Sequence, residues 1–172
     1  MKRAARARIG ARVVGIALLM SAFAMASKAA VLADADAAIT ISGRVEHPQG
    51  LTFQDLQKLP PVHVQISFLT VHGTETGDFS GALLWAVLDN AVPIDDPGRN
   101  ARLRHVVLVT GRDGYVVALS EAELDPDFEG KQVILAYAKD GRSLDTWGVR
   151  LIVPGDKHGG RAIRDIEDVN VR

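Results

Sequence analysis

Short alternating apolar segments, most of them closed by a turn with glycine or proline, most constrain how this chain folds. In segment 62–68 apolar residues alternate with His63, Gln65 and Ser67, and this period of two predicts a half-buried strand. Further strands are expected at 39–45, 106–109, 115–119, 133–138, 149–153 and 163–171. Because turns separate these segments more often than long helices, we expect an α+β domain with a mixed, largely antiparallel sheet.

Three short helices are expected between the strands. Thr52 and Asp55 form a weak capping box for a helix over 51–56, and Ser120 caps one over 121–124. The apolar positions of 82–91 recur at helical spacing. The glycine-rich stretch 72–81 is expected to be a loop, and the acidic residues of 121–129 a solvated surface.

The N-terminal segment has the form of a secretory signal. Residues 1–12 are basic without an acid, and 13–26 are apolar or small. This predicts a signal peptide at 1–26, a disordered leader at 27–38 and one domain at 39–172. Since no Arg-Arg pair is present, we expect the general secretory route of a bacterium and a periplasmic or secreted protein without a membrane anchor after cleavage.

Charge and cysteine content exclude several classes of protein. Of 20 Lys/Arg and 21 Asp/Glu, six and two lie in 1–38, which leaves 14 and 19 and a net charge of −5 for the domain. An acidic domain is poorly suited to nucleic acid, because phosphate binding needs a basic face. The chain has no cysteine, so disulfides and thiolate metal ligands are excluded.

Five segments in order resemble a known domain. They are 51–56, 79–84, 109–115, 136–137 with 140–144, and 149–156. Together they resemble the oxidoreductase molybdopterin-binding domain of the sulfite oxidase family, over most of residues 51–171. The resemblance implies the fold of that domain and suggests molybdopterin as the cofactor.

The residue that ligates the metal in that family is missing. In the family one cysteine, just after the strand that corresponds to 62–68, completes the ligands of molybdenum. Thr70 is the nearest residue by position, and a hydroxyl does not replace a thiolate. Exported enzymes with this cofactor generally leave the cytoplasm folded, by the twin-arginine route that this leader does not indicate. We therefore expect a stand-alone domain without molybdenum, without a catalytic residue of its own and without a metal site.

A basic, glycine-rich loop is the main candidate site. Segment 154–164 combines glycines, which let a ligand approach the backbone, with four basic side chains suited to an anion. The resemblance implies cofactor contacts there. The candidate binding residues in this loop are Lys157, His158, Arg161 and Arg164. Two more are Arg112, in a turn that the resemblance places near the cofactor pocket, and His72, close to Thr70 in the sequence.

Three functions stay open. The first is a binding module for an anionic small molecule or a protein partner. The second is a molybdopterin-dependent oxidoreductase with an oxygen or water ligand in place of the cysteine. The third is a structural or interaction protein whose pocket is closed by side chains.

Overall fold

Two β-sheets form the domain in the computed structural model, which describes residues 38–172. The predicted signal peptide, and the leader up to residue 37, lie outside the described residues. The strands are β1 (Ile39–Gly43), β2 (Gln49–Leu51), β3 (Pro61–Thr70), β4 (Gly73–Leu83), β5 (Val106–Gly111), β6 (Val116–Ser120), β7 (Ile134–Lys139), β8 (Arg142–Ser143), β9 (Arg150–Ile152) and β10 (Ile166–Val171). The helices are α1 (Phe53–Lys58), α2 (Leu84–Ala91) and α3 (Glu121–Leu124), with 3₁₀ turns η1 (Ala101–Arg104) and η2 (Gly159–Arg161).

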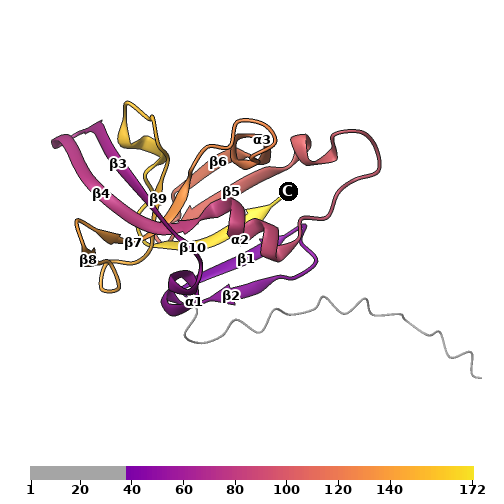
Figure 1. Cartoon of the computed structure of the whole chain (residues 1–172), viewed down its shortest axis with the longest axis horizontal. Helices are drawn as coiled ribbons and strands as arrows, with labels where there is room; N and C mark the ends of the chain where they lie inside the picture. Colours follow the sequence, from indigo (N-terminus) through magenta and orange to yellow (C-terminus); the bar gives the residue numbers. More distant parts are fainter. Residues whose placement is uncertain (1–37) are drawn as a thin grey trace, which may run out of the picture. The chain divides into compact units, whose positions relative to one another are not determined.

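The strand order confirms the predicted α+β class. One sheet has the order β2-β1-β10-β5-β6, and the other the order β3-β4-β7-β8, with β9 also paired to β7. The β1–β10 pair is parallel and the remaining strand pairs are antiparallel. Figure 1 shows the long β3–β4 hairpin beside the segment that joins β9 to β10.

The predicted capping box at Thr52 and the predicted cap at Ser120 are both present, and the latter is also a capping box. In α1 the backbone N–H of Asp55 donates to the Thr52 hydroxyl at 3.1 Å, and the Thr52 N–H donates to the Asp55 carboxylate at 3.0 Å. Ser120 and Glu123 form the same reciprocal arrangement at α3. Two otherwise unpaired N–H groups at each helix start are thereby satisfied.

The expectation of a loop over 72–81 is wrong. From residue 73 this stretch is β4, which pairs with β3 in unbroken register from Pro61–Ala82 to Thr70–Gly73. The ladder supplies backbone hydrogen bonds to a sequence of low strand propensity, and its Thr, Ser and Asp side chains lie on the exposed face.

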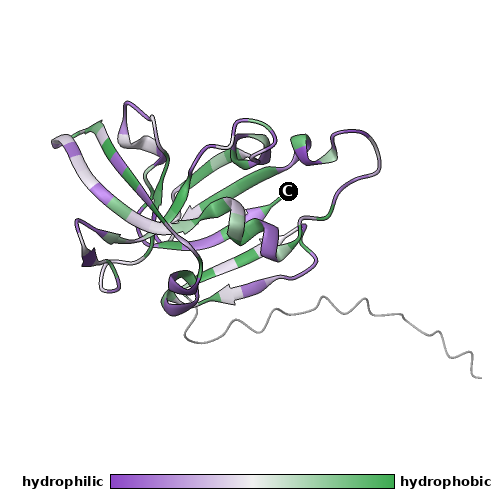
Figure 2. Cartoon of the chain, viewed as in Figure 1, coloured by the Kyte–Doolittle hydropathy of each residue, from purple (hydrophilic) through white to green (hydrophobic). Residues whose placement is uncertain are grey.

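The buried apolar residues form two clusters. The larger lies between the sheets and includes residues of β1, β5, β10 and β7, together with Leu84, Val87 and Leu88 of α2. The smaller includes Phe68 and Phe79 of the β3–β4 hairpin with Ile152 of β9. Figure 2 shows hydrophobic residues along β5, and pale to hydrophilic residues along much of β4. No helix within residues 38–172 is long and apolar enough to cross a membrane.

Candidate functional site

The basic loop 154–164 lies against the end of β3. The backbone N–H of Leu69 donates to the carbonyl of Lys157 at 2.9 Å, and Leu69 forms a parallel bridge with His158. Gly159 sits on the ring of Phe68, and a Cβ added there would lie 2.9 Å from that ring. A side chain at position 159 would therefore push the loop off the strand.

A surface pocket of about 520 Å³ lies between the loop and the β3–β4 turn. It is lined by Leu69, Thr70, Val71, His158, Gly159 and Gly160. The Thr70 hydroxyl donates to the carbonyl of Gly73 at 2.8 Å and accepts from the N–H of His72 at 3.1 Å. Its hydrogen bonds thus stabilise the turn, and the imidazole of His158 is the one ionisable side chain in this lining.

A smaller pocket of about 270 Å³ shares the two glycines. It is lined by Asp113, Tyr115, Gly159, Gly160, Ala162, Ile163 and Arg164. The Tyr115 hydroxyl donates to the carbonyl of Gly160 at 3.0 Å, so the β5–β6 hairpin and the basic loop meet here. Tyr115 itself is 53% exposed.

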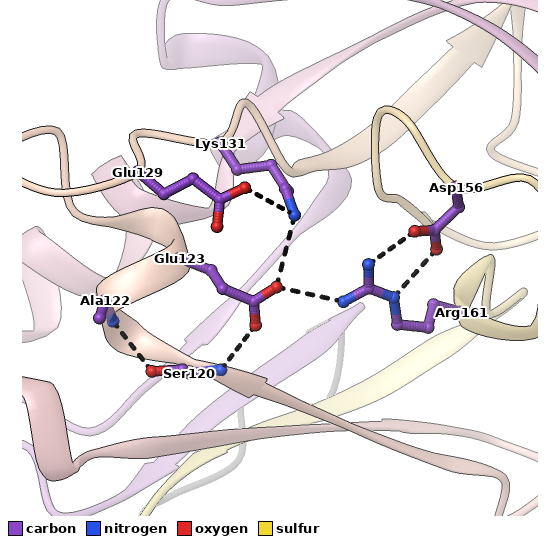
Figure 3. Close-up of polar contacts among 7 residues, drawn as sticks. All are labelled: Ser120, Ala122, Glu123, Glu129, Lys131, Asp156 and Arg161. Carbon is purple, nitrogen blue, oxygen red and sulfur yellow. Dashed lines mark hydrogen bonds and ion pairs between the residues drawn. The ribbon is translucent and has the colours of Figure 1, made fainter.

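Arg161 lines neither pocket and instead pairs with acidic side chains (Figure 3). Its guanidinium donates to both oxygens of Asp156, at 2.9 and 2.6 Å, and to Glu123 at 3.3 Å. The hydrogen bonds that Arg161 donates to Asp156 raise the pKa of Arg161. Glu123 is also the partner of the Ser120 N–H and of Lys131. The charge of Arg161 is therefore balanced within the protein.

A second carboxylate, Glu75 of β4, gathers three cations. Arg150 donates to both its oxygens at 2.7 and 3.0 Å, Lys139 at 2.9 Å, and the exposed Arg164 at 3.5 Å. The hydrogen bonds from Arg150 lower the pKa of Glu75 to about 2, although burial opposes the shift. The contact with Arg164 ties the end of the basic loop to the hairpin.

The structure brings some of the predicted binding residues together and separates others. His158 lines the larger pocket and Arg164 lines the smaller one. Lys157 is exposed and belongs to neither lining. Arg112 pairs with Asp165 at 3.2 Å. His72 is exposed in the β3–β4 turn, outside the lining of both pockets. A ligand at these residues stays a prediction.

The sequence analysis missed a buried polar cluster. Glu121, expected to be solvated, is fully buried, and its carboxylate lies 2.5 Å from Nδ1 of the buried His105. Burial raises the pKa of Glu121, while the hydrogen bond to His105 opposes the shift. Nε2 of His105 faces Asp95 at 3.6 Å. No local pattern reveals this cluster, since its residues come from separate elements.

Two further observations concern aromatic residues and metal ligands. Trp147 is 77% exposed in the turn before β9, whereas Trp85 is half-buried under the guanidinium of Arg102. Within residues 38–172, no group of three His, Asp or Glu side chains lies close enough together to hold a metal ion.

Comparison with known proteins points to one family. The family model described as oxidoreductase molybdopterin binding domain matches residues 27–172. The crystal structure of the sulfane dehydrogenase SoxCD from Paracoccus pantotrophus is similar, with a TM-score of 0.62 and 19% sequence identity. The alignment covers 77% of this chain and 37% of that chain, and at this identity it concerns the fold alone. No curated protein matches the sequence.

Proposed function

The chain belongs to the oxidoreductase molybdopterin-binding domain family, and from this premise we propose that it is a binding module of the family without molybdenum chemistry. The observation that carries the proposal is the end of β3, where the family resemblance implies a cysteine and Thr70 is the nearest residue by position. Its hydroxyl is engaged by Gly73 and His72. A chain without cysteine has no thiolate to offer a metal.

The residues around the pocket do not fit a molybdenum–pterin group. The donor set at the larger pocket is one imidazole and one engaged hydroxyl, which is unlike the thiolate that soft metal sites use. Arg161, which the resemblance implies as a cofactor contact, is held by Asp156 and Glu123. We therefore derive no reaction step through that cofactor.

An anionic ligand of modest size is the class that the remaining side chains favour. His158 lines the larger pocket, the neighbouring Lys157 is exposed, and neither forms an ion pair among residues 38–172. A side chain at Gly160 would meet no atom within 4 Å, so a ligand can reach the backbone there. The pocket volume of about 520 Å³ is in the range that small molecules occupy.

Export is the second part of the proposal. The basic, then apolar, then small-residue leader supports a signal peptide and a periplasmic or secreted location. A chain threaded unfolded across the membrane would arrive without a cofactor loaded in the cytoplasm. Fractionation of the native cells and N-terminal sequencing of the exported protein test this: a cytoplasmic protein that still begins at Met1 would contradict it.

Metal analysis and ligand screening test the binding module. Protein purified from its native compartment should contain molybdenum below about a tenth of an equivalent, since a coordinated metal would be retained. Inorganic phosphate and small carboxylates are then screened by thermal shift, where a ligand at 100 times its Kd stabilises by about 2.7 kcal/mol. Stoichiometric molybdenum would instead support the oxidoreductase with an oxygen or water ligand.

Paired variants locate the binding. The double variant Lys157→Gln/His158→Gln should abolish the thermal shift, because it removes the exposed ammonium of Lys157 and the exposed imidazole of His158. Arg99→Gln, which removes an exposed cation in the loop between α2 and η1, should leave the shift unchanged. Equal loss in both proteins would mean that only overall charge matters.

A closed interaction domain is the second candidate function. The carboxylates of Asp156, Glu123 and Glu75 already pair with Arg161 and Arg164, which favours a structural role for these two side chains. If no anion raises the melting temperature of the wild type, this candidate replaces the first.

A further inference from the structure

The outer edge of β3 is the longest unpaired strand edge among the described residues. β3 has ten residues and ends its sheet, with β4 on one side. On the other side the backbone N–H of Leu69 donates to the backbone carbonyl of Lys157, so the backbone polar groups of Leu69 point away from β4. Since backbone direction alternates along a strand, the N–H and C=O groups of His63, Gln65 and Ser67 point to this edge as well.

This edge lacks the features that usually prevent strands from pairing. Natural edge strands carry charged residues, bulges or internal prolines. Between Pro61 and Thr70 there is no Asp, Glu, Lys or Arg, and the register with β4 is unbroken. The free stretch is bounded by Pro61 at one end and by the Leu69–His158 bridge at the other. What remains, 62–68, has the length of an ordinary strand of about five to six residues.

We propose that two copies of this chain associate by antiparallel pairing of their β3 edges about a two-fold axis at Gln65. Gln65 of one copy then faces Gln65 of the other, and His63 faces Ser67. These side chains are exposed and carry no fixed charge, so the symmetric pairing brings no like charges together. The contact is isologous, with the same surface used by both copies.

The inner face of the strand favours a second copy over an unrelated peptide. In the same register Val64 of one copy lies beside Ile66 of the other, next to the smaller apolar cluster. The apolar rows of the two clusters thus continue across the axis. The opposite end of the sheet is β8, a strand of two residues, so the pairing closes at a dimer instead of growing into a fibre.

A charge placed at the axis tests the proposal. The wild type should sediment as a dimer at micromolar concentration. Gln65→Lys puts two ammonium groups opposite each other and should raise the dissociation constant at least tenfold, because like charges repel. Thr76→Lys is the matched control: Thr76 is exposed on the same sheet face, but on β4, where it pairs with Ser67 and lies one strand away from the proposed axis. It should leave the dimer intact.

Amide hydrogen exchange gives a second readout that does not depend on a variant. On concentration, the N–H groups of His63, Gln65 and Ser67 should become protected in the wild type. A wild type that stays monomeric at about 100 µM, a range in which weak dimers form, would overturn the proposal. So would equal weakening by Gln65→Lys and Thr76→Lys, protection that develops on another strand, or a monomer whose β3 edge pairs only with added peptides.

Discussion

Arg161 illustrates how one side chain fixes the position of the basic loop. Three of its nitrogens reach Asp156, five residues earlier, and Glu123 of α3. Hydrogen bonds to charged groups stabilise more than neutral ones, and an unpaired, partly buried carboxylate is costly. The loop between β9 and β10 is thereby joined to α3, which belongs to a distant part of the chain.

Removal of this guanidinium should destabilise the fold. Arg161→Ala leaves Asp156 and Glu123 without their partner, and we expect a loss of about 1–2 kcal/mol in the free energy of unfolding. Arg164→Ala is the control, since Arg164 is 73% exposed and has one contact of 3.5 Å. Urea denaturation of both variants measures the difference; an Arg164 variant as unstable as the Arg161 variant would contradict this assignment.

Glu75 should make the stability depend on acid pH. The pKa of its carboxyl is lowered to about 2 from the ordinary 4.5, so the stabilisation is present above about pH 5 and is lost as the pH falls toward 2. Glu75→Gln should cost on the order of 2 kcal/mol at pH 7. The difference in the free energy of unfolding between this variant and the wild type should shrink as the pH falls from 5 to 2. Denaturant unfolding at each pH measures that difference.

The exposed Glu46 supplies the control for this pH series. Glu46→Gln removes a carboxylate for which no side-chain partner exists among the described residues, and it should follow the wild type at every pH. If the gap between wild type and Glu75→Gln stays constant down to pH 2, the ion pairs with Arg150 and Lys139 are not its source.

At the scale of single residues, the sequence predicted where the basic side chains gather but not which carboxylates pair with them. Clustering predicted the basic loop, and the loop does lie beside Thr70 and Tyr115. Asp156 of the same loop engages Arg161, but the other two carboxylates, Glu75 and Glu123, come from β4 and α3. No spacing in the sequence links these two to Arg161 or Arg164. The burial of Glu121 was missed for the same reason, because its partner His105 lies on another element.

Elements with strong local patterns were predicted and those that depend on a neighbour were not. Alternation predicted β3, and side-chain chemistry predicted the capping box of α1 and the Ser120 cap of α3. β4 has glycines and polar residues where strands usually have branched ones, so its propensity indicates a loop. Its pairing with β3 and β7 overrides that propensity, and pairing is a property of the tertiary structure.

Gly81 tests the junction between β4 and β7. The register shifts between Ser80 and Gly81, and a Cβ at Gly81 would lie 2.4 Å from the carbonyl oxygen of Leu135. Gly81→Ala should therefore destabilise the domain by about 2 kcal/mol or more, because two strands must separate. Gly160→Ala, where the added methyl meets nothing within 4 Å, should change stability by less than about 0.5 kcal/mol. Comparable losses in urea denaturation would place the strain elsewhere.

Over the whole molecule, the larger apolar cluster stabilises the two sheets, and the smaller one stabilises the candidate site. The larger cluster joins both sheets through α2 and does not include the loop residues 154–162. The smaller one lies under the loop, where Phe68 contacts Gly159 and Ala162 packs beside it. A loop that rests on a small cluster and a few ion pairs should open at lower free energy than the sheets.

Two core truncations should distinguish opening of the loop from unfolding of the sheets in hydrogen exchange. Leu88→Ala, in the larger cluster, should cost about 2–5 kcal/mol and speed exchange throughout the domain. Phe68→Ala should speed exchange most in residues 154–164 and at the β3–β4 turn, while β1, β5 and β10 keep their protection. Phe68→Ala should also lower the affinity for any anion that the wild type binds, because the loop that carries Lys157 and His158 loses the side chain on which it packs. If both variants accelerate exchange uniformly, the clusters unfold as one unit and the loop has no separate opening.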